Sequence, residues 1–389
     1  MKELLGLDFR ANPHYELVLY DRLAADEKQR LAGLLADPGL YGILRPTGGS
    51  PLGWKSVDRD TALLFLTLRE PGPLPSYLQA ILGESLDRTV MQLVADGVFE
   101  VEAEGGGGAF VSGPAALDLD HDRGGSQDAG GPLQELSLAA LVYGQALART
   151  AAVDPALLTL RLYGYNRRPL TPAWKRLLPD APAVERFLGI DPGGTNRKLL
   201  EQRWSRRPGF AGWMSWRRRG TAGERPAARG TATYKLYVSP VPEALPTAFG
   251  EILAALDAAR VPQVKIGCDG WGLLRPDKIV AHFPDLEALA ASAARLAERL
   301  GGIPVQGVPF TAEIGGGGLL SWGVDPPTDG VPAAGRESWR TWLCQRLALA
   351  LFAARETSPE PWRFALERLR LEGVDTATWA PGALVFRQG

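Results

Sequence analysis

The chain has 389 residues, of which 45% are hydrophobic and 22% charged, and its formal net charge is −1. These values are typical of a soluble protein with two or three domains. The only cysteines, Cys268 and Cys344, exclude a disulfide framework and a cysteine zinc site. The histidines His14, His121 and His282 are too scattered for a histidine metal motif. We therefore expect no metal and no cofactor.

Targeting signals are not evident in the sequence. The first residues, MKELLGLDFRANPHYE, lack the apolar core of a signal peptide, and no run of 18 apolar residues occurs. We expect a cytoplasmic protein with no membrane partner. A net charge near zero also gives no general attraction to nucleic acid.

Residues 1–115 are expected to form a winged-helix domain preceded by short strands. Residues 15–21 are rich in β-formers, and a Gly-Gly-Ser-Pro turn separates two further strands in a hairpin. Three helices and a second hairpin follow, which is the element order of a winged helix. The hairpin strands are expected at 41–45 and 54–57, the helices at 59–70, 73–82 and 84–96, and the wing at 98–102 and 109–113.

The next segments change in composition. Residues 116–131 are acidic and rich in glycine without apolar periodicity, which indicates a linker. Residues 132–230 are expected to form a helical region in which prolines mark the helix breaks. This region includes RWSRRPGFAGWMSWRRRG (203–220), where arginine beside tryptophan could stack on bases or grip acidic peptide. We favour a solvated surface loop there.

Residues 231–389 are expected to form an α/β sandwich closed by two C-terminal helices. The pattern is β-α-β-β-α-β, which favours a split βαβ sheet with helices on one face. The expected elements are strands at 231–240, 263–268, 277–283 and 303–308, and helices at 243–260, 286–301, 338–356 and 362–373. The predicted fold class is therefore α+β.

The segment GIDPGGTN (189–196) resembles the phosphate loop of sugar kinases of the actin-like fold. Glycines in such a loop let the backbone approach a phosphate. The following RKLLEQRW has a helical pattern, however, and Pro192 disturbs the turn. We favour a turn between two helices with Thr195 or Asn196 as N-cap, and a sugar-kinase-like enzyme is the least favoured function.

The charge of the winged helix argues against DNA binding. Its third helix carries Glu84, Asp87 and Asp96 against Arg88, and acidic residues also occupy the wing, at Glu100, Glu102 and Glu104. Such a surface repels phosphate.

A winged helix preceded by strands resembles the peptide-recognition element of ribosomal-peptide modification systems. That element binds a leader peptide as an added strand along its sheet edge, against the third helix. In this chain the 41–57 hairpin would supply the edge and the apolar side of helix 84–96 the floor. The candidate peptide-binding residues are Tyr41, Ile43, Trp54, Leu86, Val90, Leu93 and Glu100. A purely structural winged helix is the alternative.

Polar residues of the C-terminal sheet form a second candidate site. Lys235, Tyr237 and Ser239 alternate onto one strand face, and Lys278 and His282 share one face of another strand. A Lys, an Arg and a His facing one cleft could bind phosphate and catalyse β-elimination, with Lys as base and His as acid. The candidate lyase residues are Lys235, Lys265, Lys278, Arg275 and His282. We favour the alternative, a sheet with one solvated face and no catalytic residues.

Four segments, in this order, resemble the C-terminal half of HopA-type effector-like proteins. They are KLYVSP (235–240), LRPDKIVAHF (274–283), GVPFTAE (307–313) and GLLSWGVDPP (318–327). The resemblance covers roughly residues 230–327. Relatives of that family occur in ribosomal-peptide clusters, where some are lyases for phosphorylated Ser or Thr.

Together with the N-terminal domain, the chain is similar to the peptide-binding proteins of crocagin-type biosynthesis. The resemblance implies an accessory protein that binds a ribosomally made precursor peptide and presents it to a modifying enzyme of the same cluster. A lyase acting on phosphorylated Ser or Thr of that peptide is the alternative. The expected partners are the precursor peptide and the modifying enzyme, and a homodimer is left open.

Overall fold

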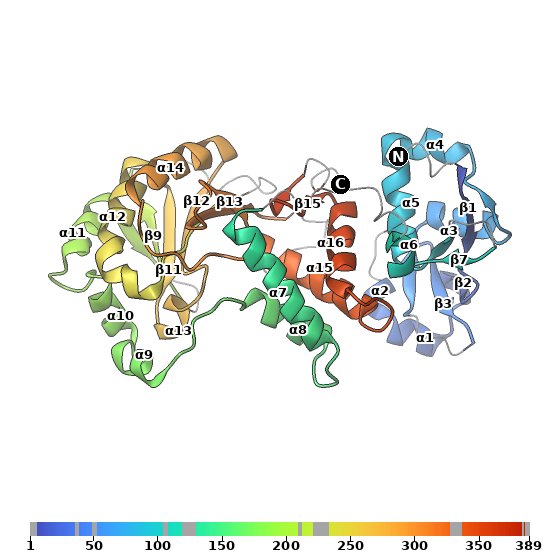
Figure 1. The fold of residues 1–389 in the computed structure, drawn as a ribbon, viewed down its shortest axis with the longest axis horizontal. Helices are drawn as coiled ribbons and strands as arrows, with labels where there is room; N and C mark the ends of the chain where they lie inside the picture. The colour runs from blue at the N-terminus through green and yellow to red at the C-terminus, as the bar shows by residue number, and fades with distance from the viewer. Residues whose placement is uncertain are drawn as a thin grey trace. The chain divides into compact units, whose positions relative to one another are not determined.

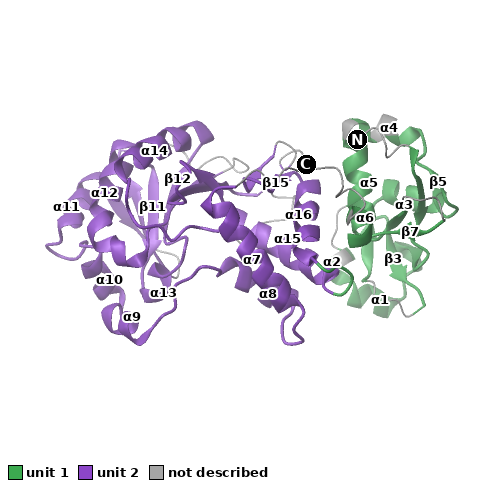
Figure 2. Ribbon diagram, in the orientation of Figure 1, with its two compact units in different colours: residues 1–126, 356–359 green, residues 127–355, 360–389 purple. Residues whose placement is uncertain are grey.

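The structure is a computed structural model. It describes residues 6–35, 39–48, 53–103, 108–118, 130–208, 212–220, 233–326, 337–382 and 385. The chain forms two compact units, residues 1–126 with 356–359 and residues 127–355 with 360–389 (Figure 2). Helices and antiparallel sheets occur in both units, so the fold class is α+β as predicted.

Unit 1 contains the strands and helices expected of the N-terminal domain (Figure 1). Its elements are β1 (Asp8–Ala11), β2 (Tyr15–Leu19), η2 (Tyr20–Arg22), α1 (Ala25–Arg30), α2 (Ala32–Leu35), β3 (Gly42–Pro46), β4 (Lys55–Val57), α3 (Arg59–Thr67), β5 (Gly72–Pro73), α4 (Tyr77–Leu82), η3 (Gly83–Ser85), α5 (Leu86–Ala95), β6 (Phe99–Glu102), β7 (Phe110–Val111) and α6 (Pro114–Asp118).

The winged-helix order is α3, α4 and α5 followed by the β6–β7 hairpin. The predicted β3–β4 hairpin is present, and β2 pairs with β3 to complete a three-stranded antiparallel sheet. Strand β1 was not predicted. It pairs with β6 and with β5, so the wing hairpin is extended into a sheet of order β5-β1-β6-β7.

The apolar face of α5 is buried in the hydrophobic core of unit 1. Leu86, Val90 and Val94 recur every four residues, so they lie on one helix face and are buried in the core that contains Phe9 and Phe99. Burial of each such side chain stabilises the fold by about 1.5–3 kcal/mol. This face is therefore part of the core in the described structure.

Unit 2 is larger and begins with helices (Figure 1). Its elements are α7 (Pro132–Ala148), α8 (Pro155–Tyr163), α9 (Pro172–Leu177), α10 (Ala181–Phe187), α11 (Thr195–Arg203), β8 (Trp204–Arg207), β9 (Trp213–Arg218), β10 (Tyr234–Val238), η5 (Pro242–Ala244), α12 (Leu245–Ala258), β11 (Gln263–Gly267), α13 (Gly270–Leu273), β12 (Ile279–Phe283), α14 (Leu286–Arg299), β13 (Ala312–Ile314), β14 (Leu320–Val324), α15 (Trp339–Ala354), α16 (Pro361–Leu371), β15 (Val374–Asp375) and β16 (Ala380–Pro381).

The central sheet of unit 2 has the order β13-β14-β10-β12-β11-β9-β8, and all neighbouring strands are antiparallel. Its part β14-β10-β12-β11 follows the predicted split βαβ pattern. The last strand of the pattern is not 303–308, however. That segment makes only an isolated bridge between Pro240 and Val305, because Pro304 has no N–H to donate and Gly307 has a φ of +81°. Strand β14 takes its place.

The Arg/Trp segment 203–220 is a second difference from the prediction. Its described part is not a loop but the antiparallel pair β8–β9, which extends one edge of the sheet. Trp204 and Trp216 are buried in the core, and the Trp204 indole donates a hydrogen bond to the Val261 carbonyl at 3.2 Å. Burial of these indoles favours strands over a solvated loop. Residues 209–211 lie outside the described residues.

One hydrophobic core joins the segments on the helical face of this sheet. Side chains from α10, α11, α12 and α14 pack there against the strands, for example Leu200, Phe249 and Leu296. The segments that we assigned to 132–230 and 231–389 thus share one compact unit. Of the predicted linker 116–131, residues 119–129 lie outside the described residues.

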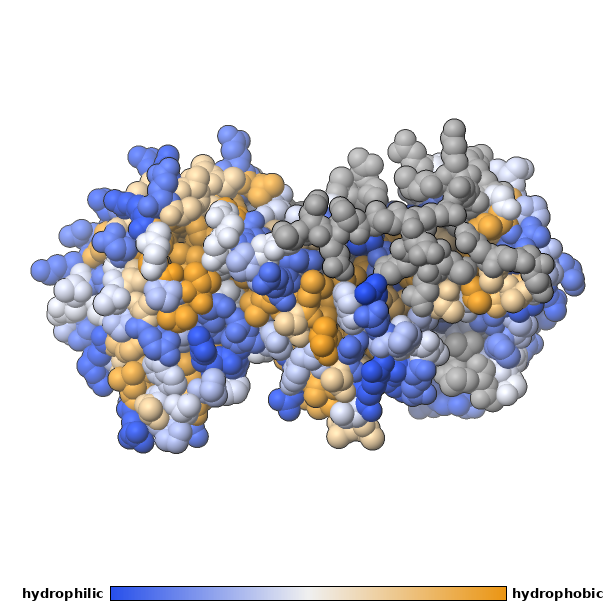
Figure 3. Space-filling view, in the orientation of Figure 1, coloured by the Kyte–Doolittle hydropathy of each residue, from blue (hydrophilic) through white to orange (hydrophobic). Residues whose placement is uncertain are grey.

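Within the described ranges, no helix is long and apolar enough to cross a membrane. Hydrophilic and hydrophobic residues are interspersed over the face of unit 2 seen in Figure 3. Among the same residues, no group of three or more His, Cys, Asp and Glu side chains could hold a metal ion.

Candidate functional site

The second face of the central sheet carries the polar residues that alternate with the core. Leu236 and Val238 of β10 are buried in the core on the helical face, whereas Lys235 and Tyr237 line a pocket. The same alternation places Lys265 of β11 in the pocket, between the buried Val264 and Ile266. The predicted polar face therefore exists, but it is covered rather than fully solvated.

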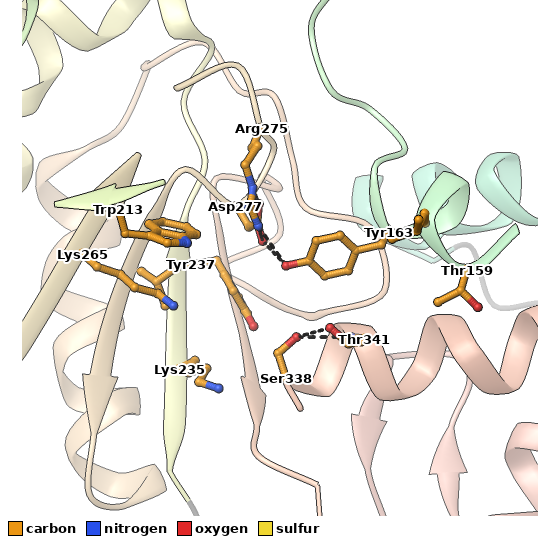
Figure 4. Close-up of a pocket in the computed structure, with 12 residues that line it drawn as sticks. Thr159, Tyr163, Trp213, Lys235, Tyr237, Lys265, Arg275, Asp277, Ser338 and Thr341 are labelled. Atoms are coloured by element: carbon orange, nitrogen blue, oxygen red, sulfur yellow. Dashed lines mark hydrogen bonds and ion pairs between the residues drawn. The ribbon is translucent and has the colours of Figure 1, made fainter. Parts of the chain in front are cut away.

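Helices α8 and α15 contribute the other wall of the pocket, which has a volume of about 330 Å³ (Figure 4). Tyr163 comes from the end of α8, and Ser338 and Thr341 come from the beginning of α15. The lining residues are Thr159, Leu160, Tyr163, Trp213, Lys235, Tyr237, Lys265, Arg275, Asp277, Val280, Ser338 and Thr341.

Asp277 is the centre of a buried network at the back of the pocket. Arg275 donates to both carboxylate oxygens at 2.8 Å, and the Tyr163 hydroxyl donates at 2.9 Å. Arg340, which is 1% exposed, completes an ion pair at 3.0 Å. Burial alone would raise the pKa of Asp277, but the two guanidinium groups hold it well below its usual range. Asp277 is therefore ionised and fixes Arg275 in place.

Lys265 differs from the other basic residues of the pocket. Its ammonium group lies 4.5 Å from the centroid of the Trp213 ring, and no described residue supplies it with a hydrogen-bond acceptor. Burial and the neighbouring charge of Lys235 lower the pKa of Lys265 to about 8. Lys265 is thus a mostly protonated amine at neutral pH that forms no ion pair with a described carboxylate.

The charge of the pocket is positive. Among the described residues, Lys235, Lys265 and Arg275 face it, against the single lining carboxylate of Asp277. Lys235 forms an ion pair with Asp325, so its charge is partly compensated. Two carboxylates therefore oppose these three cations, and the buried Arg340 adds a fourth positive charge behind them. Such an arrangement favours an anionic ligand.

Hydroxyl groups supply neutral donors beside these charges. Ser338 is the N-cap of α15, where its Oγ accepts from the Thr341 N–H at 3.2 Å. Burial raises the pKa of Tyr237 above its usual value, so its hydroxyl remains protonated. The beginning of a 16-residue helix also carries a partial positive charge. These groups could complete the coordination of a phosphate.

Two members of the predicted lyase set do not line the pocket. Lys278 is fully buried, where it donates to the Pro240 carbonyl at 2.7 Å and to the Gln306 side chain at 2.8 Å. His282 lies opposite Lys235 in the sheet, and its buried Nε2 has no hydrogen-bond partner among the described residues. Burial and two lysines lower the pKa of His282 to about 3, so it is neutral. Of the five predicted lyase residues, all of them described, Lys235, Lys265 and Arg275 line the pocket.

The turn at 189–196 connects α10 and α11, as we predicted for a helix-to-helix turn. The N-cap of α11 is Gly194 rather than Thr195 or Asn196. Asn196 instead donates to the Leu188 carbonyl at 2.7 Å, while its N–H bonds to Gly189. This internal hydrogen bonding fixes the turn.

The predicted peptide-binding residues of unit 1 divide by exposure. Ile43, Leu86 and Val90 are at most 3% exposed and belong to the core, so the floor that we expected for a peptide is closed at these positions. The carboxylate of Glu100 is paired with Arg10 at 2.6 Å. The residues that keep exposed surface are Tyr41, Trp54 and Leu93. The side chain of Glu84, and Glu104, lie outside the described residues.

Comparison with solved structures finds eight matching chains, among them two bacterial effector proteins. One is the effector protein from Pseudomonas syringae pv. syringae strain 61, with 15% identity and a TM-score of 0.38. The other is the effector protein from Pseudomonas syringae pv. tomato strain DC3000, with 11% identity and a TM-score of 0.37. Each match covers 64% of this chain and 98% of the effector. No family model and no curated protein matches the chain.

Sequence reasoning missed several residues of this pocket. Asp277 and Arg340 were not candidates, although their buried ion pair organises the site. Tyr163, Trp213 and Ser338 come from segments far from the predicted lysines. The run Arg275-Pro276-Asp277 carried a usable signal, because opposite charges two residues apart at a strand start are suited to a local ion pair.

Proposed function

We propose that the protein binds a phosphorylated peptide and holds the phosphoryl group in the pocket of unit 2. The observation that carries this proposal is the amine of Lys265, which faces the pocket beside Lys235 and Arg275 and has no hydrogen-bond acceptor in the described part of the chain. A cation that is withdrawn from water and unpaired is costly, and an anionic ligand offsets that cost.

A phosphoryl group fits the donors better than a single carboxylate. Two ammonium groups, a guanidinium and the Ser338, Thr341 and Tyr237 hydroxyls can donate to three oxygens. A pocket of about 330 Å³ also has room for one modified side chain. Trp213 and Val280 supply apolar surface for its carbon atoms.

The peptide in this proposal is a ribosomally made precursor, and the protein is an accessory that presents it to a modifying enzyme. In unit 1 the peptide would pair with the sheet that contains the β3–β4 hairpin. The contacts would come from Tyr41, Trp54 and Leu93. Tyr41 is 44% exposed although it is large and aromatic, which supports a binding role.

A lyase is the second candidate, and the lowered pKa of Lys265 favours it. Neutral Lys265 would remove the α-proton of the phosphorylated residue, the Cα–Cβ double bond would form, and the C–O bond to phosphate would break with the electron pair leaving on phosphate. Protonation of the leaving group needs an acid. His282 does not fill this role, because it is neutral and outside the lining residues. The binding function is therefore preferred.

The test is a titration of the full chain with a labelled peptide in phosphorylated and unphosphorylated form. We expect tighter binding of the phosphorylated form, and a loss of about tenfold or more in Lys265→Met, since a charge-assisted hydrogen bond contributes about 1.5–3 kcal/mol. Lys198→Met is the matched control, because Lys198 is exposed on α11. Equal affinity for the two peptides would refute the proposal.

Mass spectrometry of the same mixtures separates binding from catalysis. Intact phosphopeptide after prolonged incubation supports the accessory function. Loss of phosphoric acid with wild-type protein, and not with Lys265→Met, would instead establish the lyase.

A further inference from the structure

A pair of side chains, Arg167 and Trp271, lies outside the pocket lining. The guanidinium carbon of Arg167 is 4.0 Å from the centroid of the Trp271 ring. Trp271 is 56% exposed, although an indole normally buries most of its surface. An exposed tryptophan covered on one face by arginine is a stacking platform with a charged group beside it.

Hydrogen bonds of neighbouring residues hold the two backbone segments that carry Arg167 and Trp271. Asn166 has a φ of +63°, and its side chain donates to the carbonyls of Gln306 and Gly307 at 2.6 and 3.0 Å. Trp271 lies on the short helix α13, where Asp269 accepts from the Gly272 N–H at 2.6 Å. The platform is therefore preorganised, which lowers the entropic cost of binding.

The pair adjoins the pocket on the side of Arg275. The N–H of Arg168 donates to the Leu274 carbonyl at 3.0 Å, so the turn that carries Arg167 contacts the residue preceding Arg275. Burial and the positive charge of Arg275 lower the pKa of Arg167. The guanidinium groups of Arg167 and Arg275 thus lie close enough for each to contribute positive potential at the other.

Arg167 has no carboxylate partner among the described residues, and its Nε is buried without an acceptor. The absence of a carboxylate partner distinguishes Arg167 from the comparable pair on α16. There Arg363 lies 5.1 Å from the centroid of the Trp362 ring and also forms an ion pair with Glu360 at 2.8 Å. A buried donor left unsatisfied costs about 1–3 kcal/mol. Arg167 as a whole is only partly buried, so the rest of its guanidinium group is accessible to an external carboxylate.

We propose that Arg167 and Trp271 form a second subsite, which binds an acidic side chain of the peptide next to the phosphorylated residue. A single guanidinium fork matches a carboxylate, whereas the pocket with its two lysines matches the doubly charged phosphoryl group. The open face of Trp271 supports the aliphatic part of the bound residue. This subsite rests on the proposed function, because it names the class of peptide that the pocket receives.

The test compares four synthetic peptides, phosphorylated or not, with either glutamate or glutamine at positions flanking the modifiable residue. With the full chain we expect the glutamate phosphopeptide to bind about tenfold more tightly than the glutamine phosphopeptide. In Arg167→Gln we expect this preference to vanish while the preference for phosphate remains. Trp271→Leu should weaken binding of both phosphopeptides. Arg363→Gln is the matched control and should retain the tenfold preference.

The outcomes separate the two proposals. Equal affinity of wild-type protein for the glutamate and glutamine phosphopeptides, or a preference that survives in Arg167→Gln, refutes the subsite while the phosphate pocket stands. Binding of glutamate peptides without regard to phosphate, lost in Arg167→Gln, supports the subsite and refutes the phosphate pocket. Absence of binding for all four peptides refutes both.

Discussion

Removing the carboxylate of Asp277 is the sharpest test of how the pocket is held together. Asp277→Asn leaves Arg275 and the fully buried Arg340 without the charge that compensates them. Breaking a buried pair in this way costs about 3–5 kcal/mol. Arg340 still donates to the Pro309 and Tyr163 carbonyls, so we expect the loss in free energy of unfolding to lie near the lower end of this range.

The assay is thermal and urea unfolding of the full chain followed by circular dichroism. For a unit of this size, a loss of about 3 kcal/mol lowers the melting temperature of unit 2 by roughly 6–12 °C. Glu251→Gln is the control, since Glu251 is exposed on α12 and its loss should change stability by less than about 0.5 kcal/mol. Equal stability of Asp277→Asn and wild type would refute the argument.

The pH dependence gives a second measurement on the same variant. The folded pKa of Asp277 lies below that of an unfolded aspartate, which is about 3.9. The contribution of Asp277 to the free energy of unfolding is therefore fully present above pH ~4. It is lost as the pH falls towards the pKa of Asp277 in the folded protein. The stability gap between wild type and Asp277→Asn should narrow under acid, and a gap that stays constant would contradict the assignment.

Two further predictions concern Lys278 and Tyr41. Burial lowers the pKa of Lys278 to about 7, so between pH 7 and 10 the unfolded chain binds more protons and wild type gains stability as the pH rises. Lys278→Met should lack this gain, which urea unfolding at pH 7 and 9.5 would detect as a pH-dependent difference from wild type. Tyr41→Ser should weaken peptide binding without lowering the melting temperature, because Tyr41 is 44% exposed. Unchanged affinity would exclude Tyr41 from the peptide site.

Local patterns predicted most of the elements. Helix starts were marked by capping residues, as at Asp154 and Thr171, each of which is followed by proline and accepts from a backbone N–H in the first turn. The alternation of Lys235 with Leu236 correctly separated a polar face from a core face. These features depend on a few consecutive residues, so one sequence is enough to detect them.

The predictions that were wrong concern the pairing of strands from distant segments of the chain. The basic character of 203–220 suggested solvent exposure. In the structure, however, β9 pairs with the edge of β11, and this pairing buries the tryptophans in the core. Likewise, 303–308 has strand-forming residues but contains Pro304. Strand β14, which contains no proline, pairs with this edge of β10 instead. Position in a sheet is decided by partners that local patterns do not reveal.

The site was predicted in part for the same reason. Lys235 and Lys265 belong to one sheet face and could be grouped by alternation, whereas Arg275 lies in the bend before β12. The residues that close the pocket, Tyr163 and Ser338, come from helix ends whose packing depends on the whole of unit 2. No periodicity links them to the lysines.

The spread of the pocket along the chain links ligand binding to folding. Its walls extend from Thr159 to Thr341, so they form only when helices and sheet of unit 2 have come together. A ligand that binds only this folded arrangement stabilises it by about 2.7 kcal/mol when its free concentration is a hundred times Kd. Unit 1 has its own core and shares none of these walls. Occupancy of the pocket by phosphoserine alone, which carries no peptide segment for unit 1, would therefore slow amide exchange in the strands of unit 2 and leave exchange in the winged helix unaltered.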